Sequence, residues 1–228
     1  MDKKVTEDFF ILALNPNNGY YRVSGNYLNY GILGAILMDL ALADAIELSG
    51  KTVIVKGNQI SGVTAFDKVL EIMSSSSRER NLRTWLRRLS GKVYNYRKEL
   101  QKNLVMNGIL RQERKRFLLI PYSLYFPADP TRTSRLAMRL KDIILYNKEA
   151  NEQELMLLGL VFACRMHRNL ADTTEERRKI RKSLVKYIKE NPYAEGVSKT
   201  VTEMQAAITA SIAAAVIASS AASSSTSR

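Results

Sequence analysis

An apolar stretch covers residues 25–45 of this chain of 228 residues. Apolar side chains occupy nearly every position of the helical wheel there, so the stretch has no polar face to turn toward water. A helix with this pattern is surrounded by protein on all sides. The pattern therefore predicts a central helix around which the rest of the fold packs.

Two hairpins are predicted from short alternating runs and turn residues. Two runs around a Ser-Gly pair, over 46–55, predict the first hairpin directly after the central helix. The second is predicted over 108–120, with the charged sequence from Gln112 to Lys115 as its tip and Pro121 closing the run. Each hairpin follows a predicted helix, so the two resemble wings on a helical body.

Most of the remaining chain places apolar residues three and four positions apart, which is the spacing of amphipathic helices. One of these helices has a strong start signal, because Asp172 and Thr173 precede an acidic first turn. The predicted amphipathic helices span 65–73, 80–89, 93–107, 132–146, 152–166, 174–190 and 199–219.

No linker rich in Pro, Gly or Ser divides the first 200 residues. The expected fold is mainly α, a single globular domain over 1–218. It has a buried core helix bundle, surrounding amphipathic helices and two short β-hairpins. Residues 219–228 are mostly Ser and Ala and are expected to form a disordered tail.

Two apolar stretches, 32–48 and 206–222, are interpreted as helices buried in protein rather than as membrane spans. The first carries Asp39, Asp44 and Glu47, and the second is built from Ala and Ser instead of Leu and Ile. The N-terminal residues lack the order of a secretory signal, and a single cysteine excludes a disulfide framework. These features favour a cytoplasmic protein.

The chain carries 35 Lys and Arg residues against 22 Asp and Glu residues, a formal net charge of +13. The excess is concentrated between Arg78 and Arg116, where 13 Lys and Arg residues accompany only 3 Glu residues. A surface of one sign repels itself unless an anionic partner lies against it. The charge therefore indicates nucleic acid or an acidic membrane face as a partner.

Few residues offer catalytic or metal-binding chemistry. His167 is the only histidine, lies close to Arg165 and Arg168, and is interpreted as a surface or capping residue. Cys164 lies in an apolar run and is interpreted as an inert core thiol. Asp39 is interpreted as a structural partner of a core helix terminus or of an arginine. Paired metal-ligand motifs and a P-loop are missing, so the sequence predicts no enzyme, no cofactor and no metal site.

A Pro-bounded segment of apolar and aromatic residues, 121–127, follows the second predicted hairpin. One interpretation is a loop folded back on the core. The other is a wedge whose Leu124, Tyr125 and Phe126 enter the membrane interface. The basic neighbours that would contact lipid head groups in the second case are Arg114, Lys115 and Arg116.

Short motifs follow one another along nearly the whole chain. They are 6–14, 31–42, 46–48, Ser61-Gly62 with Asp67 and Leu70, Trp85-Leu86 with Leu89-Ser90-Gly91, 102–105 with 108–110, 126–130 and 157–160. Each motif is weak alone, but their order is specific. In that order the chain resembles a short, divergent, prokaryotic-looking member of the Golgi phosphoprotein 3 family.

The resemblance implies a mostly helical domain whose projecting hairpin, 109–120, serves self-association and membrane contact. It also implies a non-enzymatic peripheral membrane protein that binds phosphatidylinositol 4-phosphate and acts as a trafficking adaptor for glycosyltransferases. Such a protein would associate with the cytoplasmic face of a membrane, with anionic lipids and client proteins as its partners.

The positions of the family's lipid site fall on Ser24, Leu33, Tyr94 and Arg97, and Arg97 alone keeps the family's residue. Basic residues along the chain are expected to complete an anion site with it. The expected head-group site consists of Arg97 with Arg22, Lys92, Lys98 and Lys102.

A winged-helix-like nucleic-acid-binding protein is the alternative. Helices followed by hairpins also describe that fold, and a basic domain suits DNA. Against it, no compact helix-turn-helix with a short polar recognition helix precedes either predicted hairpin.

Overall fold

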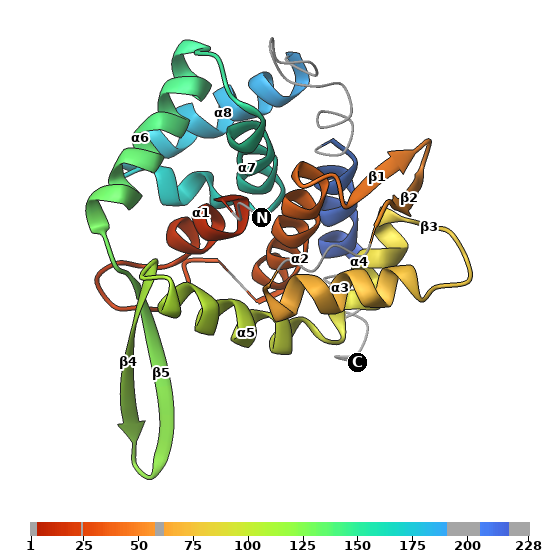
Figure 1. Cartoon of the computed structure of the whole chain (residues 1–228). Coiled ribbons are helices and arrows are strands. Elements are labelled where there is room, and N and C mark those ends of the chain that lie inside the picture. The colour runs from red at the N-terminus through yellow and green to blue at the C-terminus, as the bar shows by residue number, and fades with distance from the viewer. Residues whose placement is uncertain (1–3, 24, 58–61, 191–205, 219–228) are drawn as a thin grey trace, which may run out of the picture.

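The computed structural model describes residues 4–23, 25–57, 62–190 and 206–218. The helices of this part are α1 (Lys4–Ala13), α2 (Gly25–Leu42), α3 (Thr64–Ser74), α4 (Leu82–Ser90), α5 (Val93–Met106), α6 (Pro130–Tyr146), α7 (Glu152–Ala163), η1 (Met166–Leu170), α8 (Thr174–Glu190) and a helix over 206–218. The strands are β1 (Ile46–Ser49), β2 (Thr52–Val55), β3 (Arg80–Asn81), β4 (Leu110–Phe117) and β5 (Ile120–Pro127). Together they form one helical body from which a long hairpin projects (Figure 1). The predicted mainly α fold is confirmed, while the predicted tail over 219–228 lies outside the described residues.

α2 is the central helix, as its apolar pattern predicts. Its residues 31–40 are all buried, and α1, α4, α5 and α7 pack against it (Figure 1). Close packing requires glycine at two of these positions. A Cβ atom on Gly34 would lie 2.5 Å from Ile212 Cδ1 and 2.9 Å from Leu160 Cδ2, and one on Gly31 would collide with the ring of Phe9. The helix over 206–218 therefore rests against α2, and its Ile208 and Ile212 are buried in protein, as expected.

Asp39 of α2 caps the start of α1. Its side chain is fully buried and accepts hydrogen bonds from the backbone N–H groups of Val5 (3.1 Å) and Thr6 (2.9 Å). These two donors belong to the first turn of α1, which has no partner for them within the helix. Burial raises the pKa of Asp39 to about 7, although the hydrogen bonds from Thr6 and Val5 oppose that rise. The expected contact with a helix terminus is confirmed.

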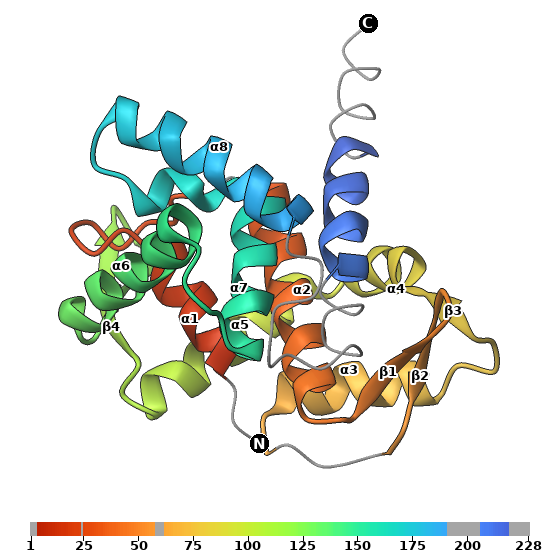
Figure 2. The ribbon, with the colours of Figure 1, turned by 90° about the horizontal axis from the view of Figure 1, so that it is seen from above.

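The other helices lie on two sides of α2. α6 and α8 pack against each other on the side of α1 and α7, whereas α3, α4 and the small sheet lie on the opposite side (Figures 1 and 2). Arg132 links α6 to α1, because its Nη2 atom lies 3.0 Å from both Glu7 Oε2 and Asp8 Oδ1 of α1.

The first predicted hairpin is confirmed and gains a third strand. β1 and β2 pair antiparallel from Ile46 opposite Val55 to Ser49 opposite Thr52, and β3 pairs with the outer edge of β2. The helix predicted over 80–89 therefore begins two residues late. Asn81 ends the strand and caps α4, since its Oδ1 accepts the N–H of Thr84 at 2.9 Å.

The second hairpin is longer than predicted, and the predicted tip is wrong. β4 and β5 pair from Leu110 opposite Pro127 to Phe117 opposite Ile120, so the turn lies at 118–119. The charged run 112–115 is part of a strand, and 121–127 is β5 rather than a loop. Pro121 is accommodated because each strand of a two-stranded sheet has one free edge, where a missing N–H costs no ladder bond.

Candidate functional site

A cleft of about 550 Å³ lies between α5, residues 121–125 of β5 and the turn that joins α1 to α2. Two cationic residues, five tyrosines and short polar side chains meet there. The cleft is lined by Gly19, Tyr20, Tyr21, Tyr94, Arg97, Lys98, Gln101, Pro121, Tyr122, Ser123, Leu124 and Tyr125. None of these lining residues is acidic, so the cleft offers donors and positive charge to an anion.

α5 supplies one whole face of the cleft. Its four lining residues occupy positions i, i+3, i+4 and i+7 of the helix, which fall on one side. They are Tyr94, Arg97, Lys98 and Gln101. The residues that face the core instead are Val93, Tyr96, Leu100 and Leu104, all buried. The same helix therefore anchors the core and presents the cationic side of the cleft.

Two contacts fix the polar side chains of the cleft. The guanidinium of half-buried Arg97 lies 5.4 Å from the ring centre of Tyr94, a distance at which the two attract each other. Gln101 Nε2 donates to the hydroxyl of Tyr21 at 2.8 Å. Burial raises the pKa of Tyr21, against the opposing charge of Arg97, so this hydroxyl keeps its proton. Tyr21 is thus available as a hydrogen-bond donor next to a fixed positive charge.

Gly19 allows the turn to approach β5. Its φ is 71°, and a Cβ atom there would lie 2.9 Å from Phe126 Cζ and 3.0 Å from Leu124 Cβ. Any other residue would push the turn away from the hairpin. Gly19 therefore sets the distance at which Tyr20 and Tyr21 face the strand.

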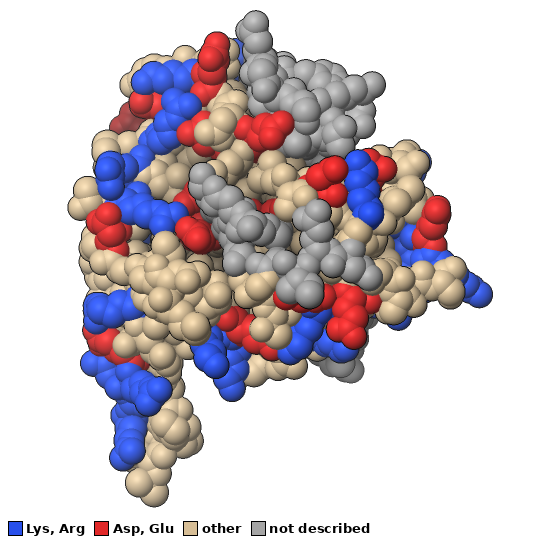
Figure 3. Space-filling model, in the orientation of Figure 1, with Lys and Arg blue, Asp and Glu red and all other residues tan. Residues whose placement is uncertain are grey.

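The hairpin tip carries four consecutive exposed apolar residues. The exposed fraction is 69% for Phe117, 83% for Leu118, 94% for Leu119 and 68% for Ile120. Exposed basic side chains precede them along β4, and Figure 3 shows Lys and Arg along one side of the hairpin with an uncharged end beyond them. β5 runs from this tip directly into the cleft, so the two features share one strand.

The basic residues next to the tip differ in how far they are neutralised. Glu113 forms ion pairs with Arg111 and, at 3.3 Å, with Lys115. Side chains alternate along a strand, so Arg114 and Arg116 share the opposite face from these three residues. Arg114 and Arg116 take part in no ion pair within the described ranges. That face of the hairpin is therefore the more strongly positive one.

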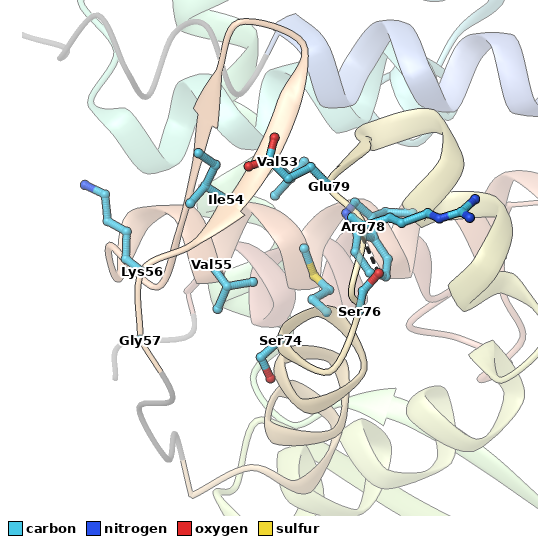
Figure 4. Close-up of a pocket in the computed structure, with 11 residues that line it drawn as sticks. Val53, Ile54, Val55, Lys56, Gly57, Ser74, Ser76, Arg78 and Glu79 are labelled. Atoms are coloured by element: carbon cyan, nitrogen blue, oxygen red, sulfur yellow. Dashed lines mark hydrogen bonds between the residues drawn. The ribbon is translucent and has the colours of Figure 1, made fainter.

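A second pocket, of about 350 Å³, lies between the β1–β2 hairpin and helices α3 and α4 (Figure 4). Its charged residues do not converge. Lys56 points away from Arg78 in Figure 4, and the Nζ atom of Lys56 lies 2.7 Å from Glu47 and 3.0 Å from Asp44. Lys56 is thus neutralised by its carboxylate partners and Arg78 lies apart from it, so this pocket lacks the adjacent pair of cations found in the cleft.

Residues 5–204 match the family model described as Golgi phosphoprotein 3 (GPP34). The chain belongs to the Golgi phosphoprotein 3 family. It is also similar to the vacuolar protein sorting-associated protein 74 of Schizosaccharomyces pombe, with 24% identity over 159 residues that cover 60% of this chain and 47% of that protein. The chain thus matches about half the length of this curated relative.

The positions implied by the Golgi phosphoprotein 3 family lie in different surroundings. Arg97 and Tyr94 line the cleft together. Leu33 is fully buried in α2 and does not reach it, and Ser24 lies outside the described residues. Among the three of these positions that the structure describes, Arg97 is therefore the basic residue that lies in the cleft.

Of the other expected head-group residues, one lines the cleft and three lie outside it. Lys98 lines the cleft beside Arg97. Arg22 and Lys102 are exposed outside the lining, and Lys92 lines a separate pocket between α3 and α5. The predicted site did not include Tyr20, Tyr21, Tyr122 or Gln101, although the spacing of Tyr94, Arg97, Lys98 and Gln101 on α5 was a visible signal.

Of the two interpretations of 121–127, the membrane wedge does not fit the position of Phe126. Phe126 is 7% exposed and packs beneath Arg111, whose guanidinium lies 4.6 Å from the ring centre. Leu124 and Tyr125 are half-buried at the base of the hairpin and line the cleft. Pairing with β4 returns these residues toward the helical body, so the exposed apolar residues are those of the tip instead.

The described residues lack both a membrane-spanning helix and a metal-binding cluster. No helix there combines the length and apolar character required to cross a membrane. No group of three or more His, Cys, Asp or Glu side chains in the same part of the chain is placed to hold a metal ion. Cys164 is buried, which raises the pKa of its thiol.

Proposed function

We propose that this member of the Golgi phosphoprotein 3 family is a non-enzymatic peripheral membrane protein that binds anionic lipid head groups in the cleft of Arg97. In this account the hairpin tip enters the cytoplasmic face of a membrane beside the bound head group. The observation that carries the proposal is the continuity of β5, which joins the exposed apolar tip to the cationic cleft.

The two features supply complementary contributions to binding. Fully burying an apolar side chain of this size is worth about 1.5 to 3 kcal/mol. Each basic residue near an anionic surface adds about 1 kcal/mol. Stable peripheral attachment generally needs two such signals, an apolar insertion and a basic patch. The tip provides the first, and Arg114, Lys115 and Arg116 provide the second.

The cleft suits a phosphate group held among donors. Arg97 and Lys98 offer positive charge, and the hydroxyl groups of the lining tyrosines and Ser123 offer hydrogen bonds. Phosphatidylinositol 4-phosphate is the head group implied by the family. Its phosphate monoester carries about −1.5 to −2 charges and three acceptor oxygens, which a site with two cations and several hydroxyl groups can pair.

Self-association and client binding are part of the same proposal. The hairpin of 109–120 has unpaired strand edges as well as the apolar tip, and both can pair with a second copy or with another protein. A protein attached to a membrane in this way would act as an adaptor for protein clients. A rise of the sedimentation coefficient with concentration, abolished by polar substitutions at Leu118 and Leu119, would support self-association through the tip.

Liposome flotation tests the head-group site. Arg97→Gln is compared with Lys102→Gln, which removes the same charge from an exposed position of α5 outside the cleft. On vesicles containing phosphatidylinositol 4-phosphate, Arg97→Gln should weaken binding about tenfold, the cost of one charge-assisted hydrogen bond, and Lys102→Gln much less. Equal losses in the two variants would contradict a site in the cleft.

The choice of lipid is tested with the same assay. Vesicles of phosphatidylcholine alone, with phosphatidylglycerol, and with phosphatidylinositol 4-phosphate at matched charge distinguish surface charge from head-group recognition. Binding to neither anionic composition at low salt would remove the membrane proposal.

Nucleic-acid binding is the second candidate. The specific observation in its favour is the row of tyrosines next to Arg97 and Lys98, because bases stack on aromatic rings in a positively charged groove. The apolar tip is a poor match for a wing that contacts phosphates. A salt-dependent gel shift, together with failure to float on anionic vesicles, would favour this candidate over the first.

A further inference from the structure

Three arginines and the only histidine of the chain meet in a pocket of about 360 Å³ between the end of α7, η1 and the middle of α8. The apolar part of its wall comes from Phe162, Leu184 and Val185. The polar residues are Arg165, His167, Arg168 and Arg181. The pocket shares no residue with the cleft of Arg97, so any ligand of this pocket lies outside the site proposed above.

The chain path brings these four side chains together. Arg165 has a φ of 55° and turns the chain from α7 into η1, which carries His167 and Arg168. α8 then packs against η1 and places Arg181 opposite them, while Leu184, one turn further on, is buried in the core. The guanidinium of Arg165 lies 5.4 Å from the ring centre of Tyr27, which holds it in place. The cationic side chains are thus positioned by three separate elements.

The pocket concentrates positive charge that no neighbour neutralises in the described part of the chain. Its lining contains no carboxylate, and none of the ion pairs found among the described residues includes Arg165, Arg168 or Arg181. The pKa of His167 is lowered, first by burial and then by the charges of Arg168, Arg181 and Arg165. These three arginines are the charged groups that act on His167 from η1, from α8 and from the turn after α7. Such a field attracts an anion into the pocket.

We propose that this pocket binds a phosphate dianion, either free or as a phosphate monoester. Guanidinium groups pair with phosphate through parallel N–H donors, and three of them match the three terminal oxygens of a monoester. A monocarboxylate would neutralise a smaller part of the charge, whereas a phosphate monoester carries about −1.5 to −2 charges at neutral pH. His167 adds a further donor when it is protonated.

The histidine makes the proposal directly measurable. His167 is the only histidine, so its ring protons give one assignable set of NMR signals, and their pH titration reports its pKa. A bound dianion favours the protonated imidazole, since an opposite charge stabilises the charged form. Phosphate should raise the pKa of His167 by about one unit relative to chloride at equal ionic strength, which equals about tenfold tighter binding of phosphate to the protonated form.

A matched pair of variants separates the pocket from general screening. Arg181→Gln removes a lining charge, whereas Lys179→Gln removes an exposed charge two residues earlier, about 200° around the same helix. The rise in the pKa of His167 with phosphate should be lost in Arg181→Gln and kept in Lys179→Gln. Arg97→Gln should also keep it, so the result is independent of the head-group site.

A second arm distinguishes the source of the phosphate. Vesicles with phosphatidic acid present a phosphate monoester at the membrane, whereas phosphatidylglycerol presents a diester. If Arg181→Gln weakens flotation on vesicles with phosphatidic acid but not on vesicles with phosphatidylglycerol, the pocket binds a lipid. If inorganic phosphate raises the pKa of His167 through Arg181, but flotation does not depend on Arg181, the pocket binds a soluble phosphate. If neither response depends on Arg181, the proposal is wrong.

Discussion

The central helix α2 and the tip of the β4–β5 hairpin are both apolar, but protein covers α2 and leaves the tip exposed. Residues 31–40 of α2 are all buried, whereas Phe117, Leu118, Leu119 and Ile120 are each more than two-thirds exposed. Burial of apolar surface stabilises the fold only where protein covers it. An exposed apolar segment can instead be buried against a partner, and the free energy of that burial then favours binding. Substitutions in α2 should therefore change stability, and substitutions at the tip should change binding.

The largest effect is expected from the buried carboxyl group of α2. The unfolded chain loses the proton of Asp39 near its ordinary pKa of 3.8, whereas the folded protein keeps it until about pH 7. The stability that this raised pKa contributes is fully present below pH 3.8, the pKa in the unfolded chain. It is lost as the pH rises to about 7, the pKa in the folded protein. The free energy of unfolding should fall by about 4 kcal/mol between these limits.

Asp39→Asn should remove that pH dependence, because the amide does not titrate and its oxygen still accepts one hydrogen bond from α1. Urea unfolding at several pH values between 4 and 8 measures how the free energy of unfolding depends on pH. Asp44→Asn serves as the control, since Asp44 is exposed and its side chain forms an ion pair with Lys56 at 3.0 Å. A slope unchanged by Asp39→Asn would show that Asp39 titrates normally in the folded protein.

The next effect sharpens the contrast at the tip. The double substitution Leu118→Ser with Leu119→Ser removes two exposed side chains, each worth about 1.5 kcal/mol on insertion into a membrane. Binding to anionic vesicles should weaken about 100-fold, measured by flotation at several lipid concentrations. The free energy of unfolding should change by less than about 0.5 kcal/mol, as is usual at exposed sites. A loss of stability without a loss of binding would reverse the roles assigned to the two regions.

The smallest of these effects lies in the packing of α2. In Gly31→Ala the new methyl group would meet the buried ring of Phe9 and the sulfur of Cys164, so overpacking should cost about 2 kcal/mol. Gly91→Ala is the matched control, because a Cβ atom there meets nothing within 4 Å. Thermal and urea unfolding compare the two, and the folded fraction of Gly31→Ala should float on vesicles as the unchanged protein does.

The two regions also differ in what the sequence could predict. The apolar pattern of α2 is local, and it predicted both the helix and its central place. Asp39 was correctly expected to contact a helix terminus. The hairpin depends on the register between its strands, and the sequence pattern alone predicts the charged run 112–115 as the tip, although this run pairs with β5. The residue types did not indicate the position of the turn, because the turn at 118–119 contains leucines instead of Gly or Asn.

Sites built by several elements were the least predictable. Arg97 and Lys98 share a helix face, which the spacing shows, but the tyrosines of the cleft come from the α1–α2 turn and from β5. For Phe126 the sequence left open a place on the core or at a membrane, and the residue packs under Arg111 because strand pairing turns it back. The arginine pocket likewise needs α8 to pack against η1 before Arg181 meets His167. Contacts between distant segments decide these placements, and periodicity does not report them.

The most direct test of the central claim places a probe at the tip. Leu119→Cys provides an accessible thiol, because the only native cysteine, Cys164, is buried. A polarity-sensitive fluorophore attached there should shift to shorter wavelength on anionic vesicles, and the same probe at Lys51→Cys, in the exposed β1–β2 turn, should not. A probe at 119 that stays in a watery environment while the protein floats with the vesicles would contradict insertion of the hairpin.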